Sequence, residues 1–224
     1  MDELTSKVLA YVERDLATIH KVTGLEQFIV GGSWASSIIA KVINEWDECS
    51  ELDGIERLEL AANDLDVYHG PFTANENAPM VVNLHEIKKY EVPGLGWELN
   101  TVNCHSLSAL GFLANNDINI TASCFEVDFT KDDLFFIKAS PRFWQFVFSE
   151  NKHRTIKVVD SFDYSKYGAT TYVWLAFKAF EMQHFKFDMG ELDPLNGTLA
   201  ISQKNKLVKM KNWDDSPFKD FECK

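Results

Sequence analysis

Hydrophobic residues recur every three or four positions at the start of the chain. In residues 2–20 these positions are Leu4, Val8, Leu9, Val12, Leu16 and Ile19. This spacing predicts an amphipathic helix. A short apolar run, Phe28–Val30, follows and predicts a buried strand that ends at Gly31-Gly32. A second helical run then extends from Ser33 to Trp46, with Ser33 as its expected N-cap.

The remaining chain alternates between short apolar runs and helical patterns. We expect strands at residues 63–68, 80–84, 97–102, 125–129, 134–137 and 155–159. We expect helices at residues 52–62 and 107–113, one that opens at Ser140-Pro141, and one at 167–184. This mixture of helices and strands predicts an α/β (α+β) fold.

The turn after the first strand is a candidate phosphate site. Gly31, Gly32 and Ser33 link a buried strand to the start of a helix. Free backbone N–H groups and the helix dipole both point toward an anion bound at such a turn. Ser33 can also donate a hydrogen bond to a phosphate.

A pair of carboxylates forms the second candidate site. Asp64 and Asp66 are two residues apart, and on a strand they project from the same face. Two adjacent carboxylates repel each other unless a cation lies between them, and Mg²⁺ prefers oxygen ligands of this kind. The polar face of a later strand carries Glu126 and Asp128, and either could be a third carboxylate.

These motifs resemble the signature of the DNA polymerase beta-like nucleotidyltransferase superfamily. The matching residues are Val30-Gly31-Gly32-Ser33 and Asp64-Leu65-Asp66-Val67, followed by Phe125-Glu126-Val127, Leu134–Ile137 and Ser140–Trp144. The similarity extends in order over roughly residues 25–190 but includes few identical positions. It implies a mixed central sheet flanked by helices, with a third carboxylate on a neighbouring strand.

The resemblance also implies an activity and its site residues. A metal-dependent nucleotidyltransferase would move a nucleoside monophosphate from a nucleoside triphosphate such as ATP to an acceptor hydroxyl. Asp64, Asp66 and Glu126, with Asp128 as the alternative, would bind Mg²⁺ or Mn²⁺. Gly31, Gly32, Ser33 and Lys178 would contact the nucleotide. The acceptor stays open between an RNA 3′ end, a protein and a small molecule.

Composition narrows the partners of the chain. Its 224 residues are 46% hydrophobic and carry a formal net charge of −12, which disfavours extensive binding to DNA or long RNA. No apolar run is long enough to span a membrane, and the N-terminus does not resemble a signal peptide. The four cysteines lack paired spacing, which is typical of a reduced, cytoplasmic protein.

We expect residues 1–160 to form the catalytic core and residues 161–224 to form a helical extension packed on it. Two other interpretations are possible. The chain could be a catalytically inactive protein of the same fold that acts as a binding or regulatory partner. It could also be an acidic interaction protein in which the motifs are coincidental.

Overall fold

The computed structural model describes residues 1–46, 60, 62, 64–73, 75, 80–114, 116, 119–132, 134–149, 155–157 and 186–188. The helices are α1 (Glu3–Thr23), α2 (Ser33–Glu45), α3 (Ala109–Ala114), α4 (Pro141–Val147) and the 3-10 helix η2 (Asn119–Thr121). The strands are β1 (Gln27–Gly31), β2 (Asp64–His69), β3 (Val81–Tyr90), β4 (Glu98–Ser106), β5 (Ser123–Asp128), β6 (Phe135–Ala139), β7 (Thr155–Lys157) and β8 (Lys186–Asp188).

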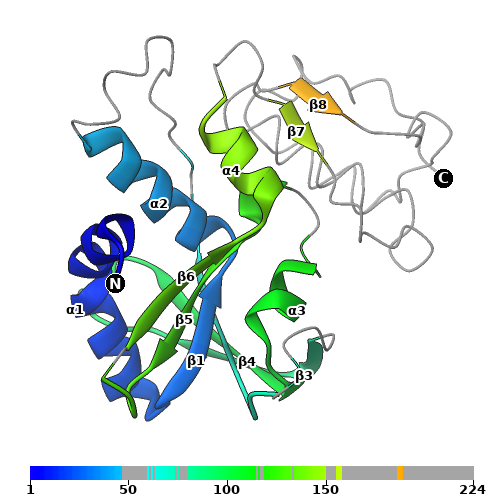
Figure 1. Cartoon of the computed structure of the whole chain (residues 1–224). Coiled ribbons are helices and arrows are strands. Elements are labelled where there is room, and N and C mark those ends of the chain that lie inside the picture. The colour runs from blue at the N-terminus through cyan, green and yellow to red at the C-terminus, as the bar shows by residue number, and fades with distance from the viewer. Residues whose placement is uncertain are drawn as a thin grey trace, which may run out of the picture.

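Six strands form one mixed sheet in the order β3-β4-β2-β1-β5-β6 (Figure 1). The β2–β4 pair is parallel, and every other neighbouring pair in this sheet is antiparallel. Strands β7 and β8 form a separate parallel pair. The predicted mixed sheet flanked by helices is therefore confirmed.

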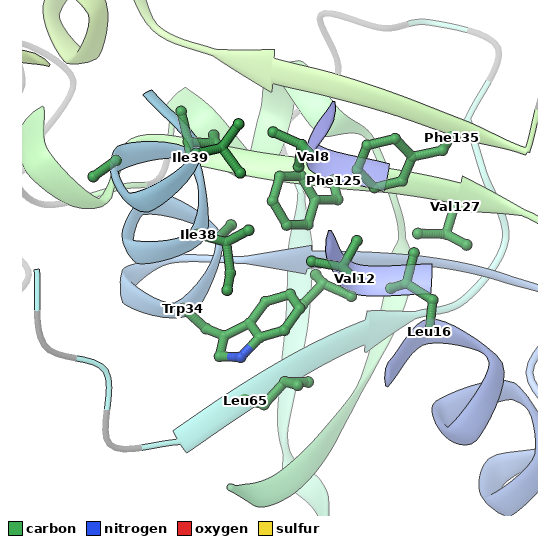
Figure 2. Close-up of a cluster of buried hydrophobic side chains, with 14 of the residues drawn as sticks. Val8, Val12, Leu16, Trp34, Ile38, Ile39, Leu65, Phe125, Val127 and Phe135 are labelled. Carbon is green, nitrogen blue, oxygen red and sulfur yellow. The ribbon is translucent and has the colours of Figure 1, made fainter. Parts of the chain in front are cut away.

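One face of the sheet is covered by α1 and α2. Figure 2 shows Val8 of α1 and Ile38 of α2 directed toward Phe125 of β5, within a cluster of fully or almost fully buried side chains. The Trp34 ring packs edge-on against Phe125 with 5.8 Å between ring centroids. Burial of this apolar surface is the main stabilising contribution to the sheet-and-helix core.

The opposite face is covered in part by α3, which lies across the sheet from α1 and α2 (Figure 1). The Phe112 ring of α3 lies directly over Gly31 and packs against Tyr68, with 5.1 Å between ring centroids. A Cβ atom added at Gly31 would be 2.2 Å from Cζ of Phe112. An alanine at this position would therefore force the Phe112 ring to shift.

Capping residues mark where α1 begins and ends and where α4 begins. Asp2 accepts a hydrogen bond from the Thr5 N–H at 2.8 Å at the start of α1, and Gly24 ends that helix with φ of 72°. Ser140 accepts from the Phe143 N–H at 3.1 Å and precedes Pro141 in α4.

In α2, however, the N-cap is Gly32, so the predicted cap role of Ser33 is wrong. The physical reason is the φ of 75° at Gly32, which makes Ser33 the first helical residue.

Other predicted elements differ from the observed ones in extent or lie outside the described residues. The strand predicted at 80–84 continues to Tyr90 in β3. The helices predicted at 52–62 and 167–184 and most of the predicted 161–224 extension fall outside the described ranges. Within the described residues, no helix combines the length and the apolar character needed to cross a membrane.

Replacing Gly31 by alanine is expected to lower the free energy of unfolding by about 1–3 kcal/mol, because the new Cβ would overlap the Phe112 ring. Urea denaturation of the two proteins measures this difference. In a Phe112→Leu background the same substitution should cost less, since the ring atoms it meets are gone. An unchanged cost in that background would show that the ring is not the cause.

Candidate functional site

Asp64 and Asp66 lie side by side on the α3 face of β2. Leu65 and Val67 alternate with them and are fully buried in the core beneath α1 and α2. The two carboxylates therefore project from the opposite face, where both residues are half-buried. The predicted placement of this pair on one face of a strand agrees with the register of the sheet.

The carboxylate pair lies next to the turn between β1 and α2. Asp66 is directly opposite Gly31 in the antiparallel β1–β2 pair. The β1–β2 register ends at this pair, and α2 begins two residues later at Ser33. The strand, the glycine turn and the acidic pair thus lie at one end of the sheet.

The start of α2 presents backbone donors at this end of the sheet. The N–H of Gly32 donates to the Ser123 carbonyl at 3.2 Å, and the N–H of Ser36 donates to the Gly32 carbonyl at 3.1 Å. No side chain caps the helix at Gly32. The intervening N–H groups of Ser33, Trp34 and Ala35 have no acceptor within the helix, which is the arrangement that suits an anion.

Strand β4 adds an amide to the acidic pair. Asn100 lies directly opposite Asp66, and Glu98 lies opposite Asp64. The Asn100 Nδ2 group donates to Asp66 Oδ1 at 3.0 Å and approaches Asp64 Oδ2 at 3.5 Å. The residue that touches both carboxylates from the neighbouring strand is therefore an asparagine.

Lys89 of β3 places a positive charge on the same face of the sheet as Asn100. It lies opposite Asn100 in the register and forms an ion pair with Glu98. The hydrogen bond to Glu98 raises the pKa of Lys89, and the charges of Asp64 and Asp66 raise this pKa further. The Lys89 ammonium group thus stays charged close to the carboxylate pair.

Glu126, the predicted third carboxylate, is not brought to the pair. It lies on β5, opposite Ile29 of β1, and β5 is not a neighbour of β2. Two strand spacings of about 4.8 Å and two residues of about 3.3 Å place its Cα about 12 Å from that of Asp66. The Phe112 ring covers Gly31 between them. Glu126 instead lines a cavity of about 80 Å³ with Lys138 and Ser108.

Asp128, the alternative third carboxylate, is engaged at the far end of β5. It accepts hydrogen bonds from Gln27 Nε2 at 2.9 Å and the Thr130 N–H at 3.0 Å, and it pairs with Lys131 at 2.9 Å. Burial raises the pKa of Asp128, but the hydrogen bonds from Thr130, Lys131 and Gln27 outweigh it and lower this pKa to about 2. Asp128 therefore stabilises a turn away from Asp64 and Asp66.

The sequence analysis did not single out Asn100, Glu98 or Lys89. Lys178, the predicted nucleotide contact, lies outside the described residues. Residues 97–102 were expected to form a strand, but only the parallel pairing with β2 shows which of its side chains meet the acidic pair. Positions 98 and 100 have the same two-residue spacing as Asp64 and Asp66, which is the one signal available in the sequence.

The side chains around Asp64 and Asp66 fit a hard divalent cation if the amide is included. Among the described residues, no group of three or more His, Cys, Asp or Glu is arranged to hold a metal ion. However, Asn100 is only 7% exposed, and its buried Oδ1 has no hydrogen-bond partner in the described part of the chain. Carboxylate and amide oxygens are both ligands that Mg²⁺ and Ca²⁺ accept.

Comparison with known proteins identifies no close relative. No family model matches the chain, and no curated protein matches it. Two solved structures, complexes of a CCA-adding enzyme with CTP and with ATP, align with a TM-score of 0.47 and 13% sequence identity. They cover 82% and 83% of this chain, which spans 42% of their length. Similarity at this level is too low to assign a function.

Replacing Asp128 by asparagine is expected to cost about 2 kcal/mol of stability near neutral pH. An unfolded Asp titrates near about 3.9, whereas the pKa of Asp128 in the folded chain is about 2. The stabilisation is therefore complete above about pH 4 and is lost as the pH falls toward 2. Denaturation of both proteins between pH 7 and 2.5 should show the difference shrinking. Asp132→Asn, which removes the same charge from the same turn, should show no such effect.

Proposed function

We propose that this protein binds a nucleoside triphosphate together with a divalent cation and transfers its nucleoside monophosphate to an acceptor hydroxyl. The observation that carries the proposal is the meeting of Asp64 and Asp66 with the Gly31-Gly32 turn and the start of α2. A paired carboxylate and an uncapped helix N-terminus are complementary to a cation and a polyphosphate, respectively.

The residues of the proposed site have separate roles. The N–H groups at the start of α2 bind the phosphates, because they are donors without an acceptor inside the helix. Lys89 adds a second positive group on the same face of the sheet. Asp64 and Asp66 would hold Mg²⁺ or Mn²⁺, and when bound this cation supplies electrostatic stabilisation of the charge that develops on the phosphoryl oxygens. Glu126 and Asp128 have no role in the proposed site.

The reaction requires the acceptor hydroxyl oxygen to form a bond to the α-phosphorus while the bond to pyrophosphate breaks. The hydroxyl proton leaves to a base or to solvent, and pyrophosphate carries away the bonding electrons. The chain contributes orientation of the triphosphate along α2 and the charge of the acidic pair.

A second candidate function is nucleotide binding without transfer. The specific observation in its favour is that the residue opposite Asp66 on the neighbouring strand, Asn100, is an amide and not a third carboxylate. An amide carries no charge and cannot accept a proton from an acceptor hydroxyl as a carboxylate can. The two candidates differ only in whether pyrophosphate is released.

Binding of ATP, CTP, GTP and UTP should depend on Mg²⁺ and on both carboxylates. Removing either charge in Asp64→Asn or Asp66→Asn is expected to weaken binding about tenfold or more, since the cation loses a ligand. Calorimetry with and without Mg²⁺ measures this. Asp132→Asn provides the control, because it makes the same charge change in the turn after β5. Equal affinities in all four proteins would contradict the proposal.

Transfer is tested separately by pyrophosphate release with RNA, protein and small-molecule acceptors. The transferase predicts release that both aspartate variants abolish. Mg²⁺-dependent binding with no release for any acceptor would favour the binding function instead.

A further inference from the structure

Asn100 holds an unusual position between the two carboxylates. Its Nδ2 group is 3.0 Å from Asp66 Oδ1 and 3.5 Å from Asp64 Oδ2, so one amide group reaches both acidic side chains. The side chain is more than nine-tenths buried. The Asn100 amide therefore places a hydrogen-bond donor between two carboxylates of like charge.

The other end of the same amide has no partner among the residues that the structure describes. Within these residues no donor reaches the buried Oδ1 of Asn100, although buried polar atoms are satisfied in the great majority of cases. The N and O ends of an asparagine amide have nearly the same shape, and rotation about χ2 exchanges them. After this rotation Oδ1 would face Asp64 and Asp66, and three oxygen atoms would converge on one point.

We propose that Asn100 is the third protein ligand of a single divalent cation that Asp64 and Asp66 bind, and that its amide rotates to present Oδ1 when the cation enters. This inference rests on the proposed function, because it concerns the same acidic pair. It explains both the donor that bridges the carboxylates without a cation and the unsatisfied oxygen beside them. Oxygen from carboxylate and amide groups is the ligand type of Mg²⁺, Mn²⁺ and Ca²⁺.

The charge of this ligand set favours one cation. Asp64 and Asp66 contribute two negative charges, and Asn100 contributes none, so one divalent ion neutralises the set. The next carboxylate on β4, Glu98, is paired with Lys89. A second divalent ion would therefore meet no uncompensated charge until a nucleotide supplies its phosphates.

Titration with Mn²⁺ alone, followed by electron paramagnetic resonance on the full, nucleotide-free chain, tests this assignment. Wild type should bind one ion per chain. Asn100→Ala should weaken binding about fivefold or more, because one ligand is lost, and Asn100→Asp should strengthen it about tenfold, because a charge is gained. Asn103→Ala is the matched control, since this amide lies on the same strand but projects from the other face.

The sign of the Asn100→Ala effect is decisive. If the amide only separates the two carboxylates, its removal takes away a donor that competes with the cation, and Mn²⁺ should bind as tightly as before or more tightly. That result overturns the inference. Asn100→Leu repeats the test with the buried volume filled, and it should also weaken binding, so a loss of folding in the alanine variant does not decide the outcome.

Failure of this inference is distinguishable from failure of the proposed function. Mn²⁺ binding that Asp66→Asn abolishes and Asn100→Ala leaves unchanged overturns the role of Asn100 but keeps the acidic pair as a metal site. Failure of the wild-type chain to bind Mn²⁺ overturns the inference itself. The proposed function fails instead on the absence of Mg²⁺-dependent triphosphate binding, which the calorimetric titration measures.

Discussion

The pairing of β1 with its two neighbours is the constraint on which the site depends. β1 is antiparallel to both β2 and β5, and Phe28, Ile29 and Val30 are completely buried between the layers. A shift of this strand by one residue would move Phe28 and Val30 into the cluster on the α3 face and take Gly31 away from the Phe112 ring. The register that buries Val30 is the same register that sets Gly31 opposite Asp66, so core packing and site geometry are fixed together.

The Phe112 ring strengthens this coupling from the other face. It packs on Gly31 and Tyr68, and the absence of a side chain at Gly31 is what allows the contact. The ring also divides that face into two regions. Asp64 and Asp66 lie on one side of it, and the cavity lined by Glu126 and Lys138 lies on the other. Two groups of charged residues on one face of one sheet are thereby kept apart.

The sequence predicted the helices and strands more closely than it predicted which strands lie side by side in the sheet. Period-three-to-four and period-two patterns located α1, α2 and β5 closely, because each of these elements buries one face against a core, and a continuous apolar run located β1, which is buried on both faces. The same alternation indicated correctly that Glu126 avoids the core face. It could not show which strands are adjacent, since strand order depends on contacts between residues far apart in the chain. The parallel β2–β4 pairing, which brings Asn100 to Asp66, leaves no local signature.

The prediction that Ser33 is the N-cap of α2 was wrong for a different reason. Serine is a preferred N-cap residue, but the chain turns at Gly32 with a positive φ that only glycine adopts without strain. The helix consequently starts one residue after the turn, and the Ser33 side chain is released from the role of cap. Local propensity was overridden by the backbone conformation that the tight strand-to-helix connection demands.

Electrostatics explains why the proposed triphosphate site would need a cation. Two unit charges about 4 Å apart interact by about 4 kcal/mol at an effective dielectric constant of 20. A triphosphate that approaches α2 meets Asp64 and Asp66 at close range, and Lys89 is already engaged by Glu98. The N-terminus of α2 carries only about half a positive charge. A divalent cation held by the two carboxylates would reverse the sign of this interaction, and for this reason nucleotide affinity and cation affinity at this end of the sheet are expected to be coupled.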